Sequence, residues 1–218
     1  MNLAFAGKFW RCLRAGRTGD AAAMKAAMFG ARAYPDIAEK LRQLRNPFPV
    51  IDVDLLRTAP EHSFGRAYAA FLDRNALRPF VVSDEVAEEL WPEHVLEVRY
   101  PLLHDAFHVL LDFDASLPGE LGVWSFVAAQ HYSPAFDRAG RWGAALYPLV
   151  APHRRSALRA AATRGRSLGA QSNCLIAEPL ELYWQDSLAE VREGFGIQKS
   201  DVGSLMPGHL SASWYPDI

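Results

Sequence analysis

Residues 93–113 read EHVLEVRYPLLHDAFHVLLDF. Apolar side chains recur in this stretch at the three- and four-residue spacing of an α-helix, and the alternation that marks a half-buried strand is missing. The spacing predicts a helix with a kink or restart at Pro101, because proline removes a hydrogen bond from the helical ladder. Polar residues with metal-binding and acid–base chemistry, His104, Asp105 and His108, lie within this mostly apolar run.

Helix signals continue on both sides of this stretch. Ser63 is a typical N-cap, and Ser83 followed by two acids is another helix start. Further helices are predicted over about residues 20–33, 36–45, 118–132, 152–164 and 179–194, and only residues 50–53 and 80–82 read as short strands. The sequence therefore predicts a mainly α protein, a compact single-domain bundle of about seven or eight helices.

The N-terminal region differs from the rest in charge. Six basic residues and a single acid, Asp20, occur between residues 1 and 33. Leu3, Ala6, Trp10 and Leu13 share one helical stripe, flanked by Lys8, Arg11 and Arg14. Such a basic amphipathic helix suits an anionic membrane surface, ordinary packing of its apolar face, or a mitochondrial leader. The proline-rich linker at 46–49 predicts a division into an amphipathic helical arm, residues 1–46, and a helical domain, residues 47–218.

Composition excludes several classes of protein. The 218 residues are 50% hydrophobic and 22% charged, as in soluble globular proteins, and the formal net charge of −2 gives a nucleic-acid role no electrostatic support. No apolar run approaches the roughly 18 residues that span a bilayer. Cys12 and Cys174 form no CxxC pair, so we expect two reduced thiols in an intracellular protein and no thiolate zinc site.

Four side chains predict a metal centre. His104 and His108 are one helical turn apart, which puts their β-carbons about 5–6 Å from each other. Asp105 borders the same face, and Glu120 begins the next helix, where a helical hairpin would bring it opposite. Two nitrogen and two oxygen ligands suit zinc, iron or manganese without choosing among them. Taken singly, each residue also has an ordinary interpretation as a core or surface histidine or as an acid in a first helical turn.

These residues resemble the signature of the Coq4 family of ubiquinone (coenzyme Q) biosynthesis proteins. The spacing of His104-Asp105, His108 and Glu120 carries the resemblance. Other segments agree in order: residues 63–68, Arg99-Tyr100, residues 119–121 and residues 179–197. The resemblance thus covers roughly residues 60–197. The chain departs from the family pattern at Pro101, where the family tends to have Arg, and at residues 127–129, where a further acid is usual.

The resemblance implies an all-α fold and a divalent metal ion, usually zinc. It implies removal of the C1 carboxylate from a polyprenylated 4-hydroxybenzoate-type precursor, in some accounts coupled to hydroxylation at the same carbon. Iron is the alternative metal for an oxidative reaction, because zinc does not change oxidation state. The catalytic set would be His104, Asp105, His108 and Glu120. Arg99 is predicted either to steer the substrate carboxylate through a bidentate contact or to form a surface or N-terminal salt bridge.

The resemblance also implies partners and a location. The partners are a polyprenylated aromatic molecule, other ubiquinone biosynthesis enzymes and a membrane surface, with no nucleic acid and with a homodimer left open. In a bacterium the protein would be cytoplasmic and peripherally associated with the inner membrane. In a eukaryote it would lie on the matrix side of the mitochondrial inner membrane. A non-catalytic scaffold that holds prenyl lipids at the membrane is the alternative function.

Two further motifs are typical of other activities, but the sequence supports these less well than a metal centre. The GxSxG string at residues 165–169 follows an Ala- and Arg-rich helix instead of the strand that a nucleophile elbow needs, so a loop between helices is predicted there. The His104-Asp105 pair is also typical of helical phosphohydrolases. Completing such a site would need His62 or His94 with Asp137 or Asp186, and would leave His108 without a role.

Overall fold

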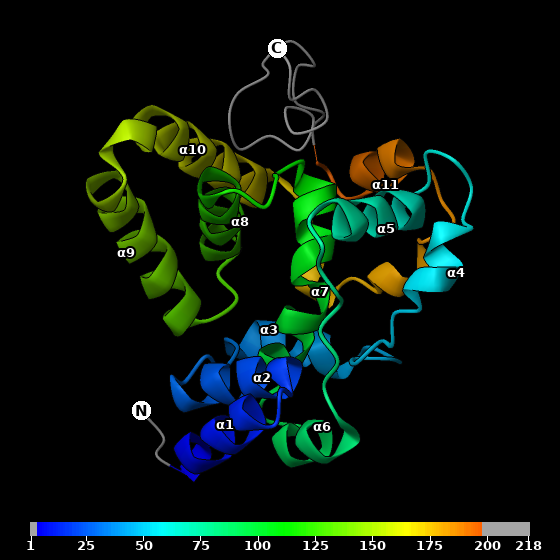
Figure 1. Cartoon of the computed structure of the whole chain (residues 1–218), viewed down its shortest axis with the longest axis vertical. Helices are drawn as coiled ribbons and strands as arrows, with labels where there is room; N and C mark the ends of the chain where they lie inside the picture. The colour runs from blue at the N-terminus through cyan, green and yellow to red at the C-terminus, as the bar shows by residue number, and fades with distance from the viewer. Residues whose placement is uncertain (1–3, 198–218) are drawn as a thin grey trace.

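The computed structural model describes residues 4–197, and the regular elements assigned in that range are all helices (Figure 1). The elements are α1 (Ala4–Arg14), α2 (Thr18–Met28), α3 (Pro35–Arg42), α4 (Val53–Arg57), α5 (Phe64–Arg74), α6 (Asp84–Leu90), α7 (Val95–Leu111), α8 (Leu117–Ala129), α9 (Pro134–Val150), η1 (Pro152–Arg154), α10 (Arg155–Gln171), η2 (Leu175–Ala177), η3 (Leu180–Leu182) and α11 (Leu188–Gly194). The predicted mainly α fold is confirmed. No helix among these residues has the length and apolarity needed to cross a membrane.

Helix α7 runs through the middle of the molecule (Figure 1). Every residue from Val95 to Leu111 is buried except His104, so this helix is covered on all sides. Of the predicted kink or restart at Pro101, the restart does not occur, because burial of the turns on both sides stabilises more than one lost hydrogen bond costs. The residues with site chemistry are therefore presented from the most enclosed helix of the fold.

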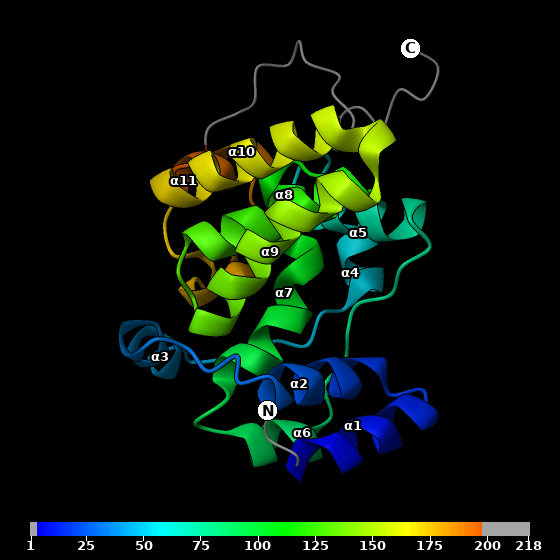
Figure 2. The ribbon, with the colours of Figure 1, turned by 90° about the vertical axis from the view of Figure 1, so that its left-hand side faces the viewer.

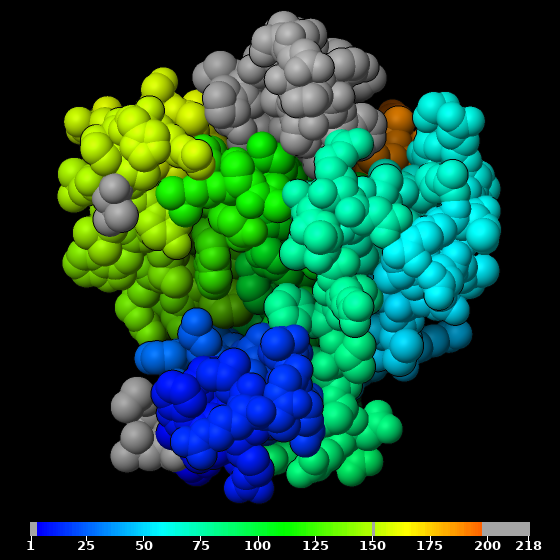
Figure 3. Space-filling view, viewed as in Figure 1, coloured from blue at the N-terminus to red at the C-terminus, as the bar shows by residue number. Residues whose placement is uncertain are grey.

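Apart from α3, which also contacts α7, the other helices lie around α7 in three groups. Helices α8, α9 and α10 form a layer on one side, and α4, α5 and α11 lie on the other (Figures 1 and 2). Helices α2 and α6 contact α7, α1 packs on α2, and the three form a lobe at the base of the space-filling view (Figure 3). The described part of the arm thus packs against the main helix through α2, while the predicted division at residue 46 stays a prediction.

Only part of the apolar surface of α1 packs against the rest of the protein. Phe5 and Phe9 are half-buried against the core formed by α2, α6 and α7, whereas Trp10 and Leu13 are exposed. Asp20 lies inside the first turn of α2, is buried, and accepts a hydrogen bond from the backbone N–H of Ser83 at 2.8 Å. Ordinary packing therefore accounts for one part of α1, and another part faces outward.

The two predicted strands are wrong. Residues 50–53 and 80–82 pair with no strand among residues 4–197. The second segment is pressed against α2: a Cβ atom on Gly19 would lie 2.3 Å from the carbonyl oxygen of Val81. Contact with a helix has replaced the neighbouring strand that this short apolar run would need.

Two other regions also differ from the predictions. Residues 134–150 form α9, which was not predicted although Ser133 caps it through the backbone N–H of Phe136 at 3.1 Å. The helix predicted over residues 179–194 is reduced to η3 and the short α11. Between them the carbonyls of Trp184 and Asp186 accept backbone hydrogen bonds from the start of α5, so tertiary contacts replace helical ones.

Glycines bring α8 and α10 into backbone contact. A Cβ atom on Gly165 would lie 2.1 Å from the carbonyl oxygen of Gly122, and one on Gly169 would lie 2.7 Å from that of Phe126. The GxSxG string is therefore inside α10, with its two glycines one turn apart on the face toward α8. The predicted loop is wrong, while the rejection of a nucleophile elbow agrees with the helix that precedes Ser167. The glycines serve close approach of two backbones.

We expect Gly165→Ala to lower the free energy of unfolding by about 1–3 kcal/mol, because the new methyl group has to push α8 and α10 apart. Gly7→Ala is the matched control, since Gly7 is also inside a helix but has no neighbouring atom within 4 Å of the added Cβ. That control should be neutral or stabilising by up to about 1 kcal/mol. Urea denaturation measures both, and equal effects at the two positions would contradict the proposed close packing.

Candidate metal centre

Two helices bring three ligand groups together. His104 and His108 lie on consecutive turns of α7, with ring centroids 4.8 Å apart. Glu120 stands in the first turn of α8, which begins at the N-cap Ser116. Its two carboxylate oxygens face the two imidazoles: one lies 3.5 Å from His104 Nε2 and the other 3.4 Å from His108 Nε2. The predicted helical hairpin thus delivers Glu120 opposite the histidine pair.

These three side chains can hold one cation. One ligand atom from each of His104, His108 and Glu120 can be chosen so that all lie within 4.8 Å of one another. His108 is almost completely buried, at 1% side-chain exposure, whereas Glu120 retains 36%. Two imidazole nitrogens and one carboxylate oxygen form a set found in catalytic zinc sites and in iron(II) oxygenases. Such sites leave coordination positions open for water or substrate.

The opposite nitrogen of each imidazole is already occupied. His104 Nδ1 lies 3.2 Å from a carboxylate oxygen of Asp105, and His108 Nδ1 lies 3.0 Å from the carbonyl oxygen of Asp114. When each Nδ1 carries the proton and donates it to that oxygen, each Nε2 keeps a free lone pair on the side of Glu120. This arrangement is typical of metal-binding histidines and fits a divalent ion.

Asp105, the fourth predicted ligand, is not among the residues that converge. It is one residue after His104, which turns it away from the stripe that His104 and His108 share, and its carboxylate contacts the outer nitrogen of His104. The structure therefore brings together three of the four predicted ligands and gives Asp105 the position of a group that orients one of them.

Charge in the site is balanced within the protein. Burial favours the neutral form of His104, but hydrogen bonds with Asp105 and Glu120 outweigh it and raise the pKa of His104 to about 9. Burial also favours neutral Glu120, yet hydrogen bonds from both histidines hold the pKa of Glu120 well below its usual range. A cation bound at this site would take over the role of the His104 proton, which links metal binding to proton release.

Two tyrosine hydroxyls near the site are buried without a hydrogen-bond partner among the described residues, those of Tyr68 and Tyr100. The Tyr100 ring meets His104 edge-on at 5.7 Å. Burial, together with the negative charge of Asp105, raises the pKa of both hydroxyls, so they stay neutral donors. Buried polar groups normally have partners, which makes these hydroxyls candidates for contact with a substrate. The sequence pattern indicated no role for either hydroxyl, although Tyr100 lies one helical turn before His104.

Comparison with known proteins identifies the family. The family model for coenzyme Q (ubiquinone) biosynthesis protein Coq4 matches residues 41–201. The chain belongs to the Coq4 family. Relatives named ubiquinone biosynthesis protein COQ4 homolog, mitochondrial, are 30% identical over 191 residues in Xenopus tropicalis and 32% identical over 180 residues in Homo sapiens.

These alignments cover much of the chain but a smaller share of the relatives. They include 84% and 76% of this chain, and 64% and 62% of the Xenopus and human proteins. The chain thus spans less than two thirds of the length of these relatives. A crystal structure of a candidate ubiquinone biosynthesis protein from Nostoc punctiforme PCC 73102 has a TM-score of 0.62 at 21% identity, over 90% of this chain and 96% of that one. It shares the fold.

Arg99 lies in a structural position. Its side chain is fully buried, and its five N–H groups have five oxygen neighbours: the carbonyls of residues 46, 47, 176 and 178 at 2.6–3.2 Å, and Glu181 at 3.6 Å. These oxygens belong to the linker after α3 and to the segment around η2 and η3. A surface salt bridge, the predicted alternative, does not fit a fully buried side chain. The contacts favour a third role, in which Arg99 holds distant backbone segments together, over steering of a substrate carboxylate.

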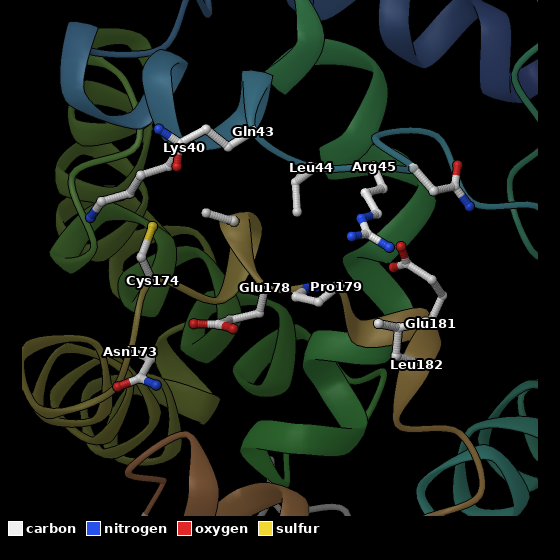
Figure 4. Close-up of a pocket in the computed structure, with 12 residues that line it drawn as sticks. Lys40, Gln43, Leu44, Arg45, Asn173, Cys174, Glu178, Pro179, Glu181 and Leu182 are labelled. Carbon is white, nitrogen blue, oxygen red and sulfur yellow. The ribbon is translucent and has the colours of Figure 1, made fainter.

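A separate cavity of about 750 Å³ lies beside the segments that Arg99 holds (Figure 4). Lys40 and Arg45 line it from α3 and the following loop, and Glu178 and Glu181 line it from the opposite side. Cys174 also lines it, but burial raises the pKa of this thiol, so it is a weak nucleophile. None of the three converging metal ligands borders this cavity.

Two of the four titratable groups that were weighed for a phosphohydrolase site, His94 and Asp137, have partners elsewhere. His94 Nδ1 contacts buried Glu97 at 2.6 Å, and Asp137 accepts a hydrogen bond from the Tyr34 hydroxyl at 3.0 Å. Neither residue belongs to the group around His104 and His108. The geometry of the described residues therefore favours the two-histidine, one-carboxylate centre.

We expect His108→Ala to abolish stoichiometric zinc binding, because it removes one of three ligands. Asp105→Asn should keep the stoichiometry and weaken the affinity by about 10–100-fold, as loss of an orienting partner does. His153→Ala, which changes an exposed histidine of η1, is the matched control and should bind zinc like the unchanged protein. Titration against a chromophoric chelator measures all three. Asp105→Asn behaving like His108→Ala would instead make Asp105 a direct ligand.

We expect Arg99→Met to lower the free energy of unfolding by about 3–5 kcal/mol, because it leaves buried oxygens without donors. Arg57→Met is the control: Arg57 also binds two carboxylates but is exposed, so its loss should change stability little. Denaturant unfolding gives both values. An Arg99→Met protein of normal stability would return Arg99 to the substrate-steering role.

Proposed function

We propose that this chain acts in ubiquinone biosynthesis as a metal-dependent carbon–carbon lyase. The substrate would be a polyprenylated 4-hydroxybenzoate-type precursor, which loses its C1 carboxylate. Membership of the Coq4 family supports the pathway. The observation that carries the reaction class is the convergence of two imidazole Nε2 atoms and one carboxylate, with both Nδ1 atoms held by oxygen partners.

The chemistry follows from this arrangement. Ring carbon C1 has to become tetrahedral before CO2 can leave, by gaining a proton in simple decarboxylation or an oxygen species in the oxidative version, and the pair of electrons from the broken C–C bond returns to the ring. When bound, a divalent ion would supply a Lewis acid for the substrate carboxylate or a ring oxygen, and iron, unlike zinc, would also supply a redox centre for the oxidative version of the reaction. His104, His108 and Glu120 would hold the ion, and Asp105 would fix the imidazole of His104.

Neighbouring side chains would orient the ring and limit water. The neutral hydroxyls of Tyr68 and Tyr100 have unused donors and can bind substrate oxygens. The Phe71 ring stacks on His108 with centroids 5.4 Å apart and covers one face of the imidazole. Tyr100 also packs on Trp124 and Phe136, so the site borders an aromatic cluster suited to an apolar substrate.

The proposal includes the partners and location implied by the family. The substrate carries a polyprenyl chain, and the other enzymes of the pathway would be neighbours at a membrane surface. The vertebrate relatives are named as mitochondrial proteins. By analogy, a eukaryotic chain would act at the inner mitochondrial membrane and a bacterial one at the inner membrane.

We expect metal-stripped protein to lose decarboxylase activity and to regain it with zinc or with iron(II), depending on whether the reaction is oxidative. His108→Ala should remain folded and yield no product, because the ion has lost its most buried ligand. Tyr100→Phe should keep its metal and lose activity by about 10–100-fold, the range of one or two hydrogen bonds to a reacting substrate. Product is measured by mass spectrometry with a short-chain prenylated substrate.

The same variants distinguish a scaffold from an enzyme. If His108→Ala only lowers the melting temperature while product formation continues, the ion is a structural clamp and the scaffold alternative holds. Full activity of the metal-stripped protein would refute the metal-dependent reaction.

A further inference from the structure

A second concave surface lies between the three helices of the outer layer. A groove of about 700 Å³ is bordered by α8, α9 and α10. Its walls consist largely of small residues, among them Ala128, Gly140, Ala144 and Ala170. Figure 2 shows α9 and α10 on the face of the molecule turned toward the viewer. None of the metal ligands borders this groove, so it is a separate feature of the fold.

Polar groups with unused hydrogen-bonding capacity line the groove. Ser125 is only 2% exposed, and its hydroxyl has no partner among the described residues. One carboxylate oxygen of Asp137 contacts the side chains of Tyr34 and His131. The other oxygen is buried and has no partner among the described residues. Buried polar atoms rarely go unpaired, so these two groups point to a ligand with its own donors and acceptors.

Two arginines at the groove are free of acidic partners. Arg141 of α9 forms no ion pair or hydrogen bond with any described side chain, and Arg166 of α10 donates only to Thr163 of its own helix, at 3.1 Å. Both are exposed. Guanidinium groups from two facing helices form a site for a phosphate or carboxylate.

The surrounding chain strengthens the positive field. Residues 138–171 contain seven arginines and no acid, in a protein whose formal net charge is −2. Arg138, Arg154, Arg155 and Arg159 are exposed as well. A single small anion would need only about two or three of these charges. A positive field spread over two helices therefore suits an extended anionic surface better.

The outer face of α9 is apolar. Trp142, Leu146 and Leu149 are 65%, 47% and 67% exposed and lie at spacings of four and three residues, so they share one stripe. Trp142 directly follows the groove residue Arg141. An exposed Trp and Leu stripe beside arginines is typical of a helix that lies in the interface of an anionic bilayer.

We propose that the groove between α9 and α10 binds the head group of an anionic glycerophospholipid while the outer face of α9 lies in the bilayer surface. The phosphate would lie between Arg141 and Arg166. Ser125 would donate to the head group, and Asp137 would accept from its hydroxyl groups. The site is independent of the metal centre and of the proposed reaction.

The test is flotation of the full chain with vesicles of phosphatidylcholine alone or mixed with phosphatidylglycerol. We expect binding only to the mixed vesicles. Arg141→Gln combined with Arg166→Gln should weaken it by about 30-fold, since each arginine near an anionic surface contributes about fivefold. Arg66→Gln combined with Arg78→Gln removes two exposed charges from α5 and the loop after it, and this control should change binding by less than about twofold.

A second variant tests the groove without changing charge. Ala145→Gln combined with Ala170→Gln adds bulk at two exposed wall positions and should also weaken binding to the mixed vesicles. Unchanged melting temperatures would show that the variants fold. Normal binding by this variant, or by the Arg141 and Arg166 double variant, would overturn the proposal.

Further outcomes separate the sources of the anion. If the protein binds inorganic phosphate but not the mixed vesicles, this is a site for a free anion, and the lipid assignment is overturned. Loss of vesicle binding in Trp10→Ala but not in Trp142→Ala would place the membrane contact on α1 instead. Equal binding to both kinds of vesicle would remove the role of the head-group charge.

Discussion

Helix α7 buries the charged side chains of Glu97, Arg99 and Asp105, and such charges have to be neutralised or hydrogen-bonded inside the protein. Glu97 contacts His94, Asp105 contacts His104, and His108 contacts the carbonyl of Asp114. Arg99 ties α7 to the linker before α4 and to the segment after α10. Because these contacts reach into loops far apart in the sequence, the central helix determines where its surroundings can lie.

The same constraint explains how Glu120 reaches the histidines. Asp112 ends α7 in the left-handed conformation, with φ 58°, and the chain turns back. His108 holds this turn through the Asp114 carbonyl, and a Cβ on Gly119 would lie 1.9 Å from that same oxygen. One imidazole therefore fixes the loop with Nδ1 and faces the carboxylate with Nε2. The ligand set and the turn that assembles it depend on a single side chain.

What the sequence revealed was local. The pairing of His104 with His108 follows from helix geometry alone, and Ser63 was identified as a cap from its type and position. Long-range contacts were not readable: nothing in residues 183–187 indicated that their carbonyls would accept hydrogen bonds from α5. The roles of Asp105 and Arg99 likewise depend on which face each presents and which distant carbonyls surround it. Local spacing could nominate those residues but could not assign their contacts.

An aromatic cluster connects the metal centre with the outer helix layer. Tyr100 contacts His104, then Trp124 at 5.8 Å and Phe136 of α9 at 4.9 Å. If α9 lies at a bilayer surface, this apolar contact path begins at the membrane side and ends at the candidate ligands. A prenylated aromatic substrate has its parts in the same order as this path: an apolar hydrocarbon tail comes first, and an oxygen-bearing ring follows. The fold would then present the polar reacting end to the ion while the tail stays near lipid, although the head-group groove and the metal centre share no residue.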